Sequence, residues 1–175
     1  MIKLITSIFL VIVWTTLFGC DEDQTIADEN NLLVNGSFED RGKGWTLFQA
    51  NQITFDHDVP DTGGYLSARI SENWGEPFSL RQSVAISAGQ HVIRLSCWGK
   101  TEGADGTFGY NFTHSIELLK AIAITDTNWT YYSMQDTINL PQNDTMVVKL
   151  QGAFSQLAPR SVWFDVCRLE LTDPQ

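Results

Sequence analysis

Three basic side chains stand at alternating positions of predicted strands in an acidic chain. Arg69, Arg94 and Lys149 each lie between two apolar residues, so we expect them on the outward faces of their strands. A guanidinium group binds a carboxylate or sulfate through two parallel hydrogen bonds, and an ammonium group binds it as a point charge. If the strands are neighbours, the three residues predict an anion-binding surface. The alternative is that each pairs with a local Asp or Glu.

Asp165 is a second residue that could do chemistry. It shares strand parity with Trp163, Cys167 and Leu169, which predicts a carboxylate directed toward a buried side. A buried carboxylate needs a cation or several hydrogen-bond donors. Two interpretations are open: the carboxylate ligates a metal ion, or it caps nearby backbone N–H groups with no metal bound.

The three histidines do not indicate catalysis. His57, His91 and His114 are far apart in the sequence, and none belongs to a metal-spaced pair or a nucleophile motif. Cleavage of a glycosidic bond requires convergent acid and base groups, such as a pair of carboxylates. We therefore favour binding over catalysis.

The beginning of the chain is typical of a secretory signal. One basic residue, Lys3, precedes an apolar stretch from Leu4 to Phe18 that ends at Gly19-Cys20. The cysteine in this place resembles the lipobox of a bacterial lipoprotein. The resemblance implies removal of residues 1–19 and acylation of Cys20, with the protein anchored by lipid in the outer membrane or at the cell surface. The alternatives are a plain signal peptide and a transmembrane anchor, but the stretch is shorter than the roughly 20 residues of a span.

The rest of the chain reads as a tether and one domain. Residues 20–30 are polar and acidic, which favours a flexible tether, and residues 31–175 are enough for a single core. The formal net charge of −10 makes nucleic acid an unsuitable partner and argues against electrostatic attraction to anionic lipids. The oligomeric state is not indicated.

The elements that must position these residues are strands. From residue 32 onward, apolar residues recur with a period of two in many short segments separated by Gly, Asn, Asp and Pro. This pattern predicts an all-β fold, a β-sandwich jelly roll of two antiparallel sheets. The stretch from Glu117 to Ile124 is compatible with a helix, but it fits a strand or a loop between strands as well.

Five segments, in order, resemble carbohydrate-binding modules of the family 4/9/22 type. The resemblance covers nearly all of residues 31–172, and the segments that carry it are Asn31–Glu39 with Gly44-Trp45, Thr62–Leu66, Leu80–Val84 with Leu95–Lys100, Asn128–Tyr132, and Trp163–Cys167.

The resemblance implies a structural calcium ion where the first strand, the Gly turn and the last strand meet. Carried over to this chain, the ligands are the side chains of Glu39 and Asp165 and carbonyl groups near Ser37 and Gly64. Hard oxygen ligands of this kind, backbone carbonyls included, are those that Ca²⁺ accepts.

The resemblance also implies a concave sheet that binds a glycan. It makes neighbours of four strands whose outward residues include Arg69, Arg94, Trp98, Asn111 and Lys149, and it places an aromatic residue, Phe48, at the groove edge. Trp74, in a nearby turn, is a second aromatic candidate. Each aromatic residue has core or edge packing as its alternative role. The same resemblance places Cys97 and Cys167 in opposite sheets with inward parity, and we expect two buried free thiols. A disulfide across the core is the alternative, and it requires Cα atoms within about 7 Å.

The sequence thus predicts a lipid-anchored, non-catalytic protein that binds a polysaccharide. If the three basic residues converge on one groove, they would suit a carboxylated or sulfated chain as the ligand. A surface adhesin or protein-interaction subunit is an alternative, and a polysaccharide lyase or glycoside hydrolase of jelly-roll fold is a more distant one.

Overall fold

The computed structural model describes residues 30–71, 78–103, 106–114, 120–152 and 160–172. Within these ranges nearly all regular structure is strand, with one short 3-10 helix, η1 (Ala50–Gln52). The strands are β1 (Thr46–Phe48), β2 (Ile53–Asp56), β3 (Ser67–Ser71), β4 (Ser79–Ile86), β5 (Gly89–Thr101), β6 (Gly106–Phe112), β7 (Lys120–Ile124), β8 (Thr130–Leu140), β9 (Asp144–Gly152) and β10 (Ser161–Thr172).

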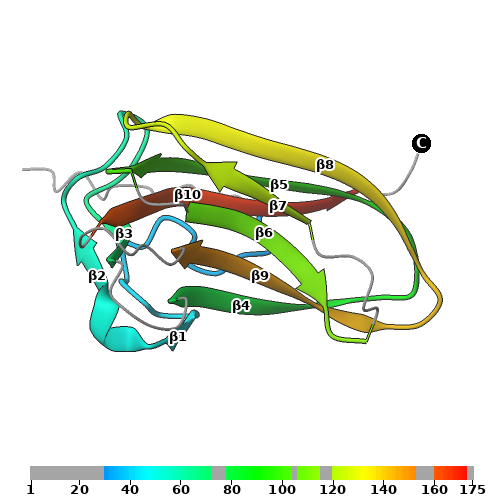
Figure 1. The fold of residues 1–175 in the computed structure, drawn as a ribbon. Helices are drawn as coiled ribbons and strands as arrows, with labels where there is room; N and C mark the ends of the chain where they lie inside the picture. Colours follow the sequence, from blue (N-terminus) through cyan, green and yellow to red (C-terminus); the bar gives the residue numbers. More distant parts are fainter. Residues whose placement is uncertain (1–29, 72–77, 104–105, 115–119, 153–159, 173–175) are drawn as a thin grey trace, which may run out of the picture.

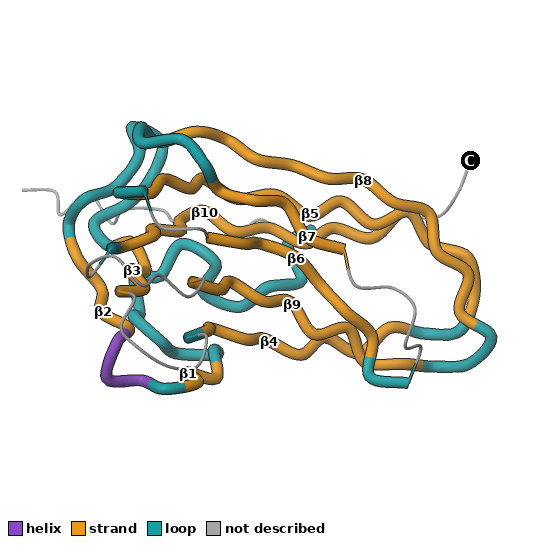
Figure 2. Tube along the Cα trace, in the orientation of Figure 1, coloured by secondary structure: helices purple, strands orange, loops and turns teal. Residues whose placement is uncertain are grey.

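The strands form two five-stranded antiparallel sheets, which confirms the predicted β-sandwich jelly roll. Sheet A has the order β1-β4-β9-β6-β7, and sheet B has the order β2-β3-β10-β5-β8. Figure 1 shows the long strands of both sheets running along a common direction, and Figure 2 shows the connecting loops gathered at the two ends. Most neighbours in a sheet are distant in sequence, so the strand order is fixed by the packed core and not by local hairpins.

The core lies between the sheets and follows the two-residue period. In β9 every second side chain, including Met146, Val148 and Leu150, is fully buried, and the residues between them are half-buried. Phe108 from sheet A and Phe164 from sheet B are also fully buried in the same core cluster. Burying each such side chain stabilises the fold by roughly 1.5–3 kcal/mol before entropy is counted.

The N-terminal segment is fastened to β10. The Asn31 side chain donates to the Cys167 carbonyl oxygen at 3.1 Å and accepts from the Leu169 N–H at 3.0 Å. A Cβ atom at Gly36 would lie 2.1 Å from the Cys167 carbonyl oxygen, so only glycine fits there. The opening motif therefore has a structural role, since it holds the first loop on the last strand.

The prediction that the four strands carrying the candidate binding residues form one sheet was wrong. The strands of Arg69 and Arg94 belong to sheet B, whereas those of Asn111 and Lys149 belong to sheet A. Alternation tells which residues of a strand point outward but not which strands are adjacent, and β10 lies between β3 and β5. The four predicted strands therefore do not form one face.

The two cysteines lie in the same sheet, not in opposite sheets as predicted. Cys97 is in β5 and Cys167 is in β10, which pair directly. Both are buried free thiols. Burial, together with the neighbouring Cys97 thiol, raises the pKa of Cys167 well above its ordinary value.

The predicted signal segment, Cys20 and all but the last residue of the 20–30 tether lie outside the described residues. Among the residues that the structure describes, no helix has the length and apolar character to cross a membrane.

Candidate functional site

The outer face of sheet A brings together polar side chains from four strands. In register across the sheet, Thr46 of β1 faces Arg81 of β4, Arg81 faces Lys149 of β9, and Lys149 faces Gly109 of β6. Opposite residues in an antiparallel pair share a face, so these residues form one row across the surface. Their neighbours on β9, including Gln151, are half-buried although they point away from the core.

An aromatic ring and two cations are adjacent on this face. Phe48 is 41% exposed, and the Arg81 guanidinium carbon lies 4.8 Å from the centre of its ring. Arg81 Nε donates to Ser79 Oγ at 2.8 Å, which fixes the guanidinium plane. Burial and the charge of Arg81 both lower the pKa of Lys149. Among the ion pairs of the described residues, none includes Arg81 or Lys149.

The floor of this face beside Lys149 is bare backbone. A Cβ atom at Gly109 would lie 2.1 Å from the Lys120 carbonyl oxygen and 2.7 Å from Ala121 Cα. Ala121 faces Gly109 on β7 and is itself small. No large side chain therefore stands at Gly109 and Ala121, on the side of Lys149 that faces away from Arg81. A strip without large side chains beside two cations and one ring can hold an extended chain of sugar rings.

Asn111 lies on the same face, two residues along β6 from Gly109. Its Nδ2 atom donates to the Phe112 carbonyl oxygen at 3.2 Å, and its Oδ1 atom is buried with no hydrogen-bond partner among the described residues. Phe48, Asn111 and Lys149 are thus the predicted binding residues that the structure brings together. Trp74 lies outside the described residues. Sequence reasoning missed Arg81, although its place beside the buried Leu80 would have put it outward.

Arg69 lies on the other side of the molecule, on β3 in sheet B. On the outer face of sheet B, Trp163 is 3% exposed, with the Arg69 guanidinium carbon 5.0 Å and Lys100 Nζ 4.7 Å from its ring. Asp56 lies 3.9 Å from Arg69, and Asp58 pairs with Lys100. Burial opposes ionisation of Asp58, but hydrogen bonds from Lys100 and Trp129 outweigh it and lower its pKa. Arg69 is a structural residue here.

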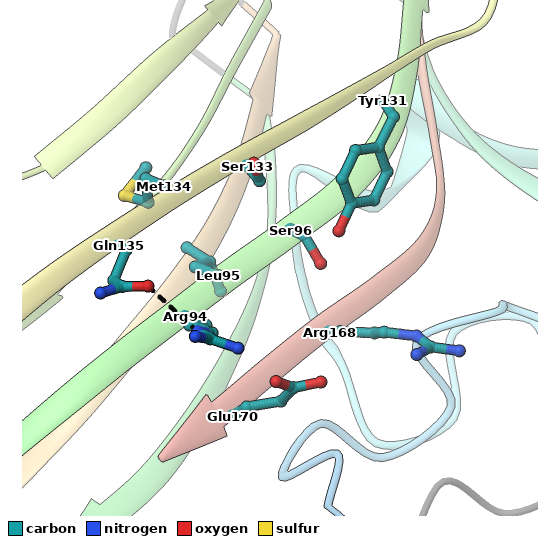
Figure 3. A pocket seen from close by; sticks show the side chains of 9 residues that line it. All are labelled: Arg94, Leu95, Ser96, Tyr131, Ser133, Met134, Gln135, Arg168 and Glu170. Atoms are coloured by element: carbon teal, nitrogen blue, oxygen red, sulfur yellow. Dashed lines mark hydrogen bonds between the residues drawn. The ribbon is translucent and has the colours of Figure 1, made fainter. Parts of the chain in front are cut away.

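Arg94 and Trp98 belong to a different part of the same face. Arg94 lines an open groove over β10, β5 and β8 (Figure 3). Trp98 packs against Tyr131, another residue of this groove. Arg69, Arg94 and Lys149 therefore do not converge on one groove, and the predicted three-cation cluster does not exist.

Asp165 is buried, but not for the reason that the sequence suggested. It lies opposite Trp98 on the outer face of sheet B, because a β-bulge between Asp165 and Arg168 reverses the parity. The intervening Val166 has φ 48°. The N-terminal loops cover this face: a Cβ atom at Gly63 would lie 2.4 Å from Asp165 Oδ2.

The carboxyl groups of Asp165 and Glu39 flank the Gly63-Gly64 turn. A Cβ atom at Gly64 would lie 2.3 Å from Glu39 Oε1, which accepts hydrogen bonds from the Tyr65 and Leu66 N–H groups at 2.8 and 3.1 Å. Asp165 is fully buried, and its Oδ2 atom has no hydrogen-bond partner among the described residues. Burial first, and then the charge of Glu39, raise the pKa of Asp165 to about 7. An orphaned buried carboxylate oxygen near a second carboxylate fits a hard cation, with Ser37 and Gly64 in the two adjoining loops.

The fold is shared with carbohydrate-binding modules of known structure. The chain is 19% identical to a family 16 carbohydrate-binding module, with a TM-score of 0.58, and the match covers 82% of this chain and 100% of that one. It is 16% identical to TmCBM61, solved in complex with β-1,4-galactotriose, with a TM-score of 0.51 and coverage of 82% and 99%.

An enzyme also contains this fold. The chain is 14% identical to the enzymatically active domain of tailspike protein 4 from bacteriophage CBA120, with a TM-score of 0.64. The match covers 82% of this chain but only 22% of that one. No family model matches the chain, and no curated protein matches it in sequence. At these identities the comparisons establish the jelly-roll fold, and function rests on the surfaces described above.

Proposed function

We propose that this protein binds a carboxylate-bearing polysaccharide on the outer face of sheet A and does not cleave it. The observation that carries the proposal is the pair of Arg81 and Lys149, which face each other across β4 and β9 beside the Phe48 ring and have no ion-pair partner among the described residues. Two like charges side by side in a sheet destabilise it, and a bound carboxylate would relieve that repulsion.

The chemistry of the face supports binding without catalysis. Its outward positions in β4, β6 and β9 carry Ser, Arg, Ala, Thr, Gly, Asn, Val, Lys and Gln, with no carboxyl or imidazole group at the described positions. Hydrolysis of a glycosidic bond needs such groups as acid and base. The shared fold with carbohydrate-binding modules is consistent with this proposal.

Affinity electrophoresis tests the proposed ligand class. Polygalacturonate and alginate should retard the purified protein, neutral glucans and xylans should retard it less, and added salt should weaken the effect because exposed charges are screened. Arg81→Ala with Lys149→Ala should reduce the affinity at least about tenfold, since a charge-assisted contact contributes roughly 1.5–3 kcal/mol. Lys43→Ala removes an exposed lysine that already pairs with Asp40, so it matches the loss of charge and serves as control. The proposal is refuted if acidic polysaccharides retard the double variant as much as the wild type, or if they do not retard the wild type at all.

Two further parts of the proposal concern anchoring and calcium. Acylation of Cys20 would hold the protein at a bacterial membrane surface, and Cys20→Ala should move it from the detergent phase to the aqueous phase. Calcium would be held by the side chains of Glu39 and Asp165 and by carbonyl groups near Ser37 and Gly64. There it would neutralise the two carboxylates and join the N-terminal loops to β10.

A further inference from the structure

The outer face of sheet B has an open groove away from the covered end. Its volume is about 380 Å³, and it runs over β10, β5 and β8. Figure 3 shows Tyr131 and Ser96 at one end of the groove and Arg94, Gln135 and Glu170 at the other. Pockets that bind small molecules typically measure roughly 300–1,000 Å³ and combine an apolar surface with a few polar groups.

The groove exists because small side chains lie between large ones. Three rows cross the sheet in register, and in the middle row Ser96 faces both Arg168 and Ser133. On one side the next row is Trp98 and Tyr131, and on the other it is Glu170, Arg94 and Gln135. The two serines leave a depression with an aromatic wall and a planar polar wall.

The aromatic wall is held in place and open to solvent. Tyr131 is 53% exposed, and the centre of its ring lies 5.8 Å from that of Trp98 at an angle of 60°. The tilted contact supports the tyrosine ring from one side and leaves its other surface free. An exposed, rigid aromatic surface suits the apolar C–H face of a sugar ring.

The polar wall carries both signs of charge. Arg94 Nε donates to Gln135 Oε1 at 3.0 Å, which fixes its side chain, and Glu170 lies opposite Arg94 on β10. Planar donors and acceptors side by side match neighbouring hydroxyl groups of a sugar. Within this row the charges of Arg94 and Glu170 balance, and the Arg168 side chain, which also lines the groove, extends away from them in Figure 3. The row itself therefore gives no preference for an anionic ligand, unlike the row of Arg81 and Lys149.

We propose that this groove is a second carbohydrate-binding site, which takes a neutral sugar unit with its ring on Tyr131 and its hydroxyl groups on Arg94, Gln135 and Glu170. It lies on the opposite outer face of the sandwich from Arg81 and Lys149, so one molecule can hold two glycan chains at once. Two linked sites raise the apparent affinity for a polysaccharide surface without any new contact.

The test follows backbone and indole NMR signals while cellohexaose, laminarihexaose, xylohexaose, mannohexaose and galactotriose are added separately. At least one should shift the signals of Trp98, Ser96 and Gln135, both in the wild type and in the Arg81→Ala, Lys149→Ala variant. Because the double variant lacks the cations of the proposed acidic site, signal shifts that persist in it come from the groove. Failure of the acidic site would be seen separately, as no binding of polygalacturonate to the wild type.

Tyr131→Ala should weaken that binding at least about tenfold, because the stacking surface is lost. Tyr131→Phe keeps the ring and should retain most of the affinity, and Tyr65→Ala, which removes another exposed ring, should have no effect. Unchanged melting temperatures show that each variant is folded. The proposal is overturned if none of the five sugars shifts the groove signals, or if the shifts survive Tyr131→Ala.

Discussion

On the outer face of sheet A, Arg81 and Lys149 lie side by side with no carboxylate paired to them among the described residues. On the outer face of sheet B, Arg69 and Lys100 have Asp56 and Asp58 as partners. The side-chain types are similar, but their surroundings differ. The comparison teaches that a basic residue on a strand acquires its role from the charged groups around it, which can come from a loop or from a diagonal position, and not from its own outward position.

The largest expected effect concerns the covered end of sheet B and its buried Asp165. Its pKa of about 7, against 3.8 for the ordinary group, means that the folded state holds the proton more tightly than the unfolded state. In EDTA, stability should therefore fall as pH rises from about 4 to about 7, by up to about 4 kcal/mol. Asp165→Asn should remove this part of the slope. Parallel stability–pH curves from urea unfolding for wild type and variant would contradict the assignment.

Added calcium should reverse that loss at neutral pH. An ion that binds only the folded state adds about 2.7 kcal/mol of stability at a concentration of one hundred times its Kd. The melting temperature of the wild type should rise with calcium and fall with EDTA, and Asp165→Asn should abolish the response. Asp144→Asn is the matched control, because Asp144 is also buried but lies far along sheet A. Identical melts in EDTA and calcium would remove the metal site.

An intermediate effect is expected when Arg69 is replaced, and this variant tests whether Arg69 stabilises the fold or contacts the ligand. Arg69→Ala removes the contact with Trp163, the 2.9 Å hydrogen bond to Ser161 Oγ and the pairing with Asp56. We expect a loss of about 1–2 kcal/mol in the free energy of unfolding and no change in polysaccharide retardation. A loss of glycan binding with full stability would mean that Arg69 contacts the ligand after all.

The smallest expected effect comes from giving Arg81 a carboxylate partner of the kind that Arg69 has on sheet B. Lys149→Glu places a carboxylate opposite Arg81, so the fold should become more stable by about 0.5 kcal/mol while binding to acidic polysaccharide is lost. Lys149→Gln removes the charge without reversing it and should give an intermediate stability. Chemical denaturation and affinity electrophoresis measure the two properties on the same samples. Lower stability of Lys149→Glu than of Lys149→Gln would show that the two cations do not repel each other.

The sequence predicted the fold because the two-residue period is a local signal. Parity also placed Asn111 and Lys149 on an outward side, which the register confirms, whereas the position of Phe48 at a groove edge came from the family resemblance. Strand order is not local: β3 and β5, which carry Arg69 and Arg94, lie in sheet B, whereas β9, which carries Lys149, lies in sheet A. The bulge at Val166 is equally invisible to a parity count, because one extra residue exchanges the two faces. Arg81 could have been found by parity, but its adjacency to Lys149 required the register.

Gly109 has a consequence for how this surface can change. Its backbone approaches β7 so closely that no side chain can be added without moving the strand. The Gly109 position is therefore closed to mutation, while Phe48, Arg81 and Lys149 point outward and are at least partly exposed. A combinatorial library aimed at new ligands should randomise these three positions and keep Gly109 constant. Natural diversification of specificity on this scaffold would follow the same route.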